Sequence, residues 1–278
     1  MKNDGRIILS FKRKADATIA DRTYREGNFR ISSNQSSDPV VPYYFLIATG
    51  GGYTEGERYS QEITAGKNTH AVVTTQAPTY IYKCEHDHET TAKNRIVVEE
   101  NAALELYSDE LIPYENARFS GATEVELSDN STVIITEGIT GGWSKDDLPF
   151  KYTQISTKLL VKRNQRTVFN DHIILDPVES DMREIGYFDK WTNYNSVTVF
   201  DEGIDKAMVE RLRKAVERID YDGKAGMSLL ADRGISLKML SDSGYKNHKL
   251  MWAFITAFRE NEKGYKAISL RKKNVIGI

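Results

Sequence analysis

Three side chains that often bind transition metals alternate along one short stretch of the sequence. Cys84, His86 and His88 are each two residues apart, so on a β-strand all three would point from the same face. Thiolate and imidazole groups suit Ni²⁺, Cu²⁺ or Zn²⁺. The surrounding residues are polar, and the stretch Glu85–Thr91 has the character of a hairpin tip. We therefore favour solvated loop residues, with a metal-binding or storage site as the alternative.

Carboxylates are a second source of chemistry, because two of them facing each other can perform acid–base hydrolysis as in β-rich glycosidases. The candidates stand beside glycine or proline: Glu55, Glu57, Glu137 and Asp176. Acids in such positions are typical of turns. The spacing alone does not bring any two of them face to face, so a carboxylate-dependent hydrolase remains an alternative function.

Familiar catalytic motifs are absent from the sequence. There is no GxxxxGK[ST] nucleotide loop, no HExxH zinc motif and no GxSxG elbow. The run Gly50–Gly52 is followed by Gly56, which does not have the GxGxxG spacing. A single cysteine excludes an internal disulfide and any site that needs several cysteines.

Most of the chain has the pattern of β-strands, which must position these residues. Short runs of β-branched and apolar residues alternate with turn residues at intervals of roughly 8–12 positions. This spacing predicts a mainly β fold of stacked sheets in which antiparallel pairing dominates. We expect strands at Arg6–Lys12, Thr69–Thr75, Arg95–Val98, Ala103–Tyr107, Thr123–Leu127, Ser131–Thr136, Thr153–Lys162, Arg166–Phe169, His172–Leu175 and Ser196–Phe200.

The pattern changes near residue 204. An apolar stripe with helical spacing runs from Ile204 to Ile219, and a second runs from Leu250 to Phe258. Between them, Ile235–Leu240 alternates like a strand. We expect one domain over residues 1–278, with a β body at 1–203, a helix-containing part at 204–278, and both helices packed on a sheet.

The charges are divided unevenly along the 278 residues. The net charge is only −2, which argues against a nucleic-acid partner. Residues 205–278 hold 16 Lys and Arg against 9 Asp and Glu, whereas residues 85–147 hold 15 acids against 4 bases. No apolar run is long enough for a membrane span or a signal peptide. With one cysteine, these observations favour a reducing, cytoplasmic location.

Six sequence blocks resemble, in order, the signatures of the UreD (UreH) family of urease accessory proteins. The first three are GGGYTEGERY, VTTQAPTYIYK and YSDELIPYENARF. Together the blocks cover nearly the whole chain, and Leu270-Arg271-Lys272 resembles the family's closing motif. The six are Gly50–Tyr59, Val73–Lys83, Tyr107–Phe119, Thr136–Trp143, Asp171–Pro177 and Gly226–Leu240.

The resemblance implies a non-enzymatic chaperone that helps insert nickel into the urease apoprotein. Its implied partners are UreF, the GTPase UreG bound through UreF, and apo-urease, and its implied fold is a β-rich body with a pair of helices. Nickel is expected as a transient ion passing through an internal channel, not as a tightly bound cofactor.

Three acids match acidic positions of the family blocks, and we expect them to line the nickel path: Glu57, Glu137 and Asp176. Carboxylates bind the ion weakly enough to release it, as ion conduction requires. We expect structural roles for Gln76 at a strand end, for Arg118 paired with an acid inside the β body, and for the Gly50, Gly51 and Gly52 run in a tight backbone approach.

Overall fold

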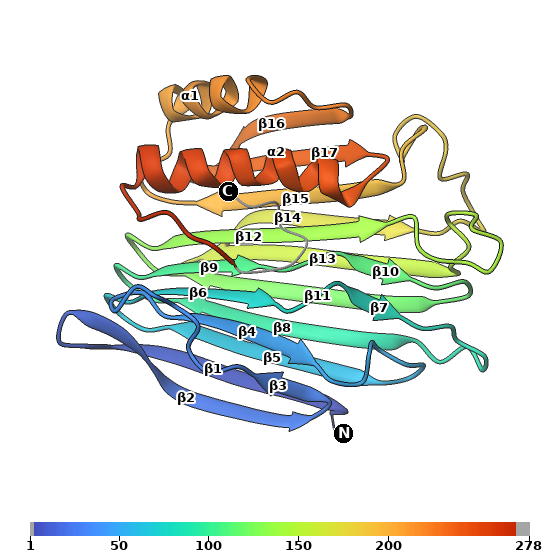
Figure 1. Cartoon of the computed structure of the whole chain (residues 1–278), viewed down its shortest axis with the longest axis horizontal. Helices are drawn as coiled ribbons and strands as arrows, with labels where there is room; N and C mark the ends of the chain where they lie inside the picture. The colour runs from blue at the N-terminus through green and yellow to red at the C-terminus, as the bar shows by residue number, and fades with distance from the viewer. Residues whose placement is uncertain (1–2, 271–278) are drawn as a thin grey trace.

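The computed structural model describes residues 3–270, and within them the chain forms two large sheets (Figure 1). The seven-stranded sheet has the order β14 (Arg166–Leu175), β13 (Gln154–Arg163), β11 (Arg118–Leu127), β8 (Thr90–Val98), β5 (Arg58–Ala65), β1 (Gly5–Lys14) and β2 (Ala17–Gly27). The ten-stranded sheet follows the order β16 (Lys224–Leu230), β17 (Gly234–Ser241), β15 (Asn193–Phe200), β12 (Thr132–Thr140), β9 (Ala103–Tyr107), β6 (His70–Thr75), β4 (Tyr43–Ala48) and β3 (Phe29–Ile31), with β7 (Thr79–Ile81) and β10 (Leu111–Pro113) attached. The predicted mainly β fold class is confirmed.

The strand directions correct one part of the prediction. The middle of each sheet is parallel: β5, β8, β11 and β13 run the same way in one sheet, and β4, β6, β9 and β12 do so in the other. Antiparallel pairs occur toward the edges, as between β1 and β2, β13 and β14, or β15 and β17. The expected dominance of antiparallel pairing is therefore wrong.

The reason lies in the path of the chain. After β4 it crosses from one sheet to the other between most consecutive strands, so the parallel neighbours in each sheet are not consecutive in sequence. Short strands separated by turns look the same in sequence whether the chain folds back or crosses over. The number of residues from one parallel strand to the next also varies: β5, β8, β11 and β13 begin at residues 58, 90, 118 and 154. The sequence therefore shows no clear repeat.

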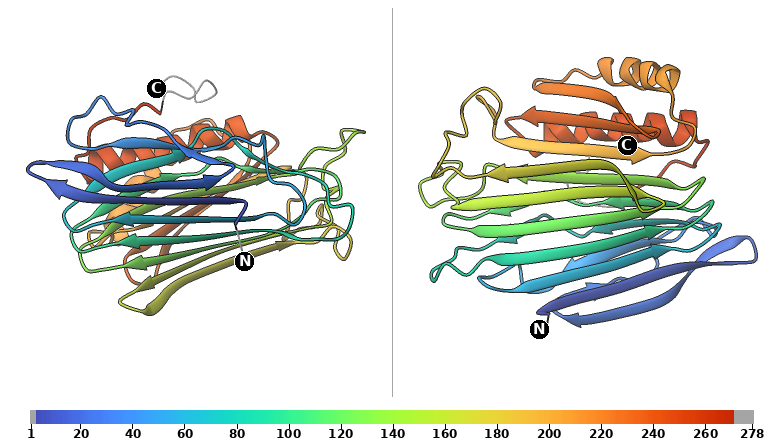
Figure 2. Two further views of the ribbon diagram at one scale, coloured as in Figure 1. Left: turned by 90° about the horizontal axis from the view of Figure 1, so that it is seen from below. Right: turned by 180° about the vertical axis from the view of Figure 1, so that it is seen from behind.

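Two apolar cores divide the molecule into three layers. One core fills the space between the sheets and includes Leu9, Val73 and Leu104. The other lies between the ten-stranded sheet and the helices and includes Val197, Leu237 and Phe254. Figure 2 shows the seven-stranded sheet from behind, with the helices on the far side against the other sheet.

Both predicted helices are present. Helix α1 spans Lys206–Glu217, and the Asp205 side chain caps it by accepting a hydrogen bond from the Met208 backbone nitrogen at 2.7 Å. Helix α2 spans Gly244–Thr256 and continues as a π-helix, η1, over Ala257–Glu262. Within residues 3–270, no helix has the length and apolar character that crossing a membrane requires. Of the closing motif, Arg271 and Lys272 lie outside the described residues.

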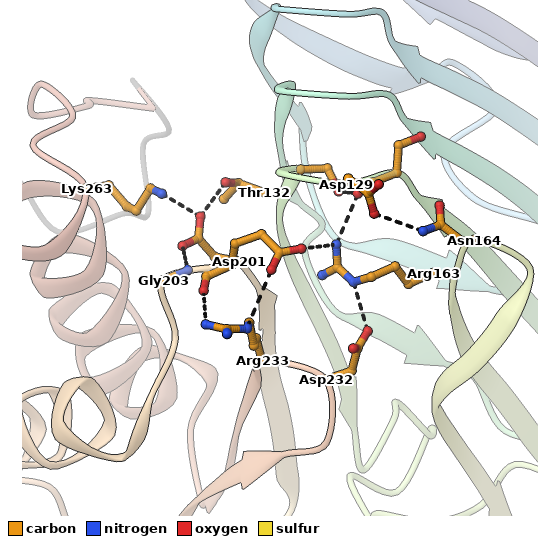
Figure 3. A network of polar contacts seen from close by, with 12 residues as sticks. Asp129, Thr132, Arg163, Asn164, Asp201, Gly203, Asp232, Arg233 and Lys263 are labelled. Carbon is orange, nitrogen blue, oxygen red and sulfur yellow. Dashed lines mark hydrogen bonds and ion pairs between the residues drawn. The ribbon is translucent and has the colours of Figure 1, made fainter.

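A polar network ties the helical end of the chain to the β body (Figure 3). Asp201, at the end of β15, accepts a hydrogen bond from Thr132 and pairs with Lys263, both at 2.5 Å. The buried Arg163 bridges Asp232, at 2.8 Å, and Glu202, at 3.1 Å. Because β15, β17 and β16 also extend the ten-stranded sheet, the C-terminal part shares its framework with the body.

Candidate functional site

Three cavities lie in a row through the molecule. The inner cavity, of about 120 Å³, is bordered by both sheets. It shares Tyr53, Gln61, Thr75 and Thr79 with the glycine-end cavity, of about 250 Å³, which reaches Gly51 and Gly52. On its other side it shares Ile139, Ile173 and Tyr194 with the lysine-end cavity, of about 520 Å³, which reaches β14, β16 and β17. The inner cavity therefore lies between the other two.

Glu137 lines the inner cavity because of the alternation along β12. Residues Val133, Ile135 and Ile139 on the same strand face belong to the core between the sheets, and Glu137 falls on that face. Burial raises the pKa of Glu137 to about 7, and the negative charge of Asp171 adds to the rise while Lys238 opposes it. The carboxyl group thus changes charge close to neutral pH.

Two further carboxylates border these cavities, and the sequence analysis did not select them. Asp109 lines the inner cavity and accepts a hydrogen bond from the Thr75 hydroxyl at 2.9 Å. Asp171 lines the lysine-end cavity and pairs with Lys238 at 2.6 Å. Asp171 shares a strand face with Ile173 and Leu175, an alternation that the sequence displays and that would have favoured it over Asp176.

Uncharged oxygens complete the lining of the inner cavity. Thr75, Ser108, Thr136 and Tyr194 all contribute to its wall. Asn94 donates to Thr123 through Nδ2, while its buried Oδ1 has no hydrogen-bond partner among the described residues. The lining of this cavity contains neither histidine nor cysteine. Its polar groups are mostly oxygens, which bind divalent cations more weakly than thiolates do, and they stand among apolar side chains and Lys158.

Glu57 and Asp176, the other two acids expected on the nickel path, lie outside the three cavities. Glu57 accepts hydrogen bonds from the Thr54 backbone at 2.7 Å and from the Tyr59 hydroxyl at 2.5 Å. Asp176 follows β14 and accepts one from Gln154 at 2.9 Å. These are the contacts of turn residues, and the structure does not place either acid beside Glu137.

Gly51 and Gly52 border the glycine-end cavity together with Gln76. Gly51 has a φ of +76°, a conformation that side chains rarely adopt. A Cβ at Gly52 would lie 2.6 Å from the Tyr80 carbonyl oxygen, so the backbone approach there requires glycine. Gln76 directly follows β6, and its backbone nitrogen donates to the Leu46 carbonyl at 3.0 Å.

Arg118 pairs with an acid, but not with the kind we expected. Its Nε lies 2.9 Å from Asp87 Oδ1, and Asp87 is on an exposed loop and not inside the β body. The expected internal partner is therefore wrong. The strand that carries Arg118 begins at this residue, so its side chain meets the loop at the sheet's end and not the core.

The Cys84–His88 segment is a surface loop organised by Glu55. The Glu55 carboxylate accepts backbone hydrogen bonds from residues 85, 86 and 88, and these bonds lower its pKa to about 2. Across residues 3–270, no group of three or more His, Cys, Asp or Glu side chains is arranged to hold a metal ion. The loop interpretation of Cys84, His86 and His88 fits this geometry better than a storage site.

Comparison with known proteins agrees with the sequence blocks. A family model described as "UreD urease accessory protein" matches residues 3–274. A urease accessory protein UreD from Streptococcus thermophilus is 36% identical over 272 residues, covering 98% of both chains. One from a Bacillus species (strain TB-90) is 33% identical over 243 residues, covering 87% of this chain and 89% of its own. The chain therefore belongs to the UreD family of urease accessory proteins and is not itself an enzyme.

Proposed function

We propose that this protein acts in urease maturation as a nickel-insertion chaperone whose row of cavities conducts Ni²⁺ to the apo-urease active site. In this proposal UreF binds the protein, UreG is recruited through UreF, apo-urease is the receiver, and the assembly works in the cytoplasm. Nickel is cargo, held only in transit. The observation that carries the proposal is the inner cavity between two wider cavities, with the carboxyl groups of Asp109 and Glu137 in its wall.

The chemistry of the lining suits transit better than storage. An ion that enters must exchange part of its water shell for protein oxygens, and it must bind weakly enough to leave. Asp109, Glu137 and Asp171 supply negative charge along the row, with Thr, Ser and Asn oxygens between them, and three lysines also line it: Lys158, Lys224 and Lys238. Cys84, the one thiol, borders none of the three cavities, so it does not compete for the ion. Glu57 and Asp176 stay predicted nickel-path residues.

The test is urease activation under limiting nickel. Urease and all its accessory proteins are co-expressed with wild-type protein or with Glu137→Ala, and nickel per urease active site is measured by mass spectrometry. We expect at least a several-fold loss of nickel, with the accessory complex still recovered by pull-down. The matched control is Glu124→Ala, which removes an exposed carboxylate on β11 that pairs with Lys162. Full nickel loading with Glu137→Ala would contradict the proposal.

A further inference from the structure

The ammonium group of Lys238 already pairs with a carboxylate in the wall of the lysine-end cavity. Its Nζ lies 2.6 Å from Asp171 Oδ2, and both residues line the lysine-end cavity. The Lys238 side chain is 45% exposed, whereas that of Asp171 is 20% exposed. The carboxylate is thus held in the wall while the ammonium group can reach solvent on its flexible stem.

The β-sheet register places Glu137 near the same ammonium group. Glu137 on β12 is opposite Ser196 on β15, and Ser196 is opposite Lys238 on β17. Residues directly opposite each other across a sheet share a face, so Glu137 and Lys238 both point toward the space between the sheets. Asp171 comes from β14 of the facing sheet. Asp171 therefore pairs with Lys238 from the facing sheet, and Glu137 lies two strands from Lys238 on the same face, near enough for the lysine charge to act on it.

A divalent cation and this ammonium group would compete for the same oxygens. With Lys238 in place, Asp171 is neutralised, and a metal ion approaching it meets a like charge at close range. With Lys238 turned outward, the ion meets the Asp171 carboxylate without a competing ammonium group, and the Glu137 carboxyl group lies farther along the row. The lysine therefore sets how readily the row of cavities accepts a cation from this end.

A second lysine provides an internal comparison. Lys224 lines the same cavity, but its Nζ lies 2.7 Å from Asp189, which is not among the lining residues. Its side chain is 59% exposed, similar to Lys238. Removing Lys224 takes the same charge from the same cavity without freeing Asp171.

We propose that Lys238 is a tethered counter-ion that occupies Asp171 and must be displaced before a divalent cation enters the row of cavities from this end. The inference rests on the proposed conduit function and adds its regulation: free divalent ions are kept out until the lysine leaves the carboxylate. Lys238 is a gating residue here and not a ligand of the ion.

The test measures Ni²⁺ binding to the isolated full-length chain by titration calorimetry at pH 7.5. We expect Lys238→Met to bind Ni²⁺ about tenfold more tightly than wild type, which corresponds to about 1.4 kcal/mol. Lys238→Arg, which keeps the charge, and Lys224→Met should both match wild type. Adding Asp171→Asn to Lys238→Met should remove the gain, because the freed carboxylate is then absent. Circular dichroism confirms that each variant is folded.

Several outcomes would contradict the proposed gating role of Lys238. Equal Ni²⁺ affinity of Lys238→Met and wild type would contradict it, and the same gain in Lys224→Met would show a general charge effect. If the tighter Ni²⁺ binding persists when Asp171→Asn is added to Lys238→Met, then Asp171 is not the carboxylate that the lysine leaves free. The conduit proposal fails separately: if Glu137→Ala loads urease fully while Lys238→Met still binds more Ni²⁺, the cation competition stands without the conduit.

Discussion

Two glutamates on the same sheet have opposite surroundings. Glu105 on β9 points toward the helices, where Arg259 of η1, His70 and Tyr107 all contact its carboxylate. Burial alone would raise the pKa of Glu105, but the His70 hydrogen bond and the charge of Arg259 hold it below the usual value. Glu137 on β12 points the other way, into the inner cavity, and burial raises its pKa to about 7.

The difference separates an acid that stabilises the fold from one available to a ligand. Glu105 is fully buried and its oxygens are already occupied, so it holds η1 against the sheet. Glu110 repeats this arrangement on the same side, where His248 of α2 and Asn195 contact it. Glu137 keeps its carboxyl group beside a cavity, with charged neighbours acting at longer range. Such an uncompensated acid costs stability and is typical of functional sites.

The largest expected effect comes from breaking the buried pair. Arg259→Met leaves the Glu105 carboxylate buried without its cation, which should lower the free energy of unfolding by about 3–5 kcal/mol. Urea denaturation measures this. Arg211→Met is the matched control, since Arg211 pairs with Glu262 of η1 but is 56% exposed, and its shift should be far smaller. Equal losses in the free energy of unfolding for the two variants would contradict the contrast between the buried and the exposed ion pair.

An intermediate effect, with the opposite sign, is expected for Glu137→Gln. The pKa of Glu137 is about 7 in the folded protein against 4.5 for the unperturbed group, so ionisation disfavours the folded state as pH rises through this window. At pH 8 the substitution should therefore stabilise the protein by about 2–3 kcal/mol, and the gain should largely disappear near pH 4.5.

Denaturation midpoints across this pH range check the prediction for Glu137. Glu124→Gln, at the exposed pair with Lys162, should show no comparable pH-dependent gain. A Glu137→Gln variant that is less stable than wild type at pH 8 would mean that the carboxylate is compensated like Glu105, and the contrast between the two acids would be lost.

The smallest effect is expected for the turn acids. Asp176→Asn keeps an acceptor oxygen for Gln154 and should change the free energy of unfolding by about 1 kcal/mol or less. If Asp176 serves only its turn, nickel loading of urease under limiting metal should stay at the wild-type level. A loss as large as that of Glu137→Ala would instead place Asp176 on the nickel path, as the sequence analysis expected.

The sequence was sufficient for much of what depends on local pattern, although the expected strands omit β2, β4, β5 and β16 and divide β14 in two. Strand runs such as Ala103–Tyr107, the two helical stripes and the family blocks were all readable, because side-chain periodicity and turn residues act over a few positions. The sequence also showed that Glu137 matches an acidic position of one of the family blocks. The same alternation would have selected Asp171, which shares a strand face with Ile173.

Tertiary structure decided which strands become neighbours and which acids face a cavity. The chain crosses between sheets after most strands, so the pairs β5–β8 and β9–β12 join residues some thirty positions apart, and no local pattern records that choice. Side chains from distant parts of the chain form the row of cavities and the Lys238–Asp171 pair. The same is true of the contacts that Arg259 of η1 makes with Glu105. Sequence alone therefore determined many of the elements and the family, whereas long-range packing decided that Glu105 would be paired and Glu137 left open.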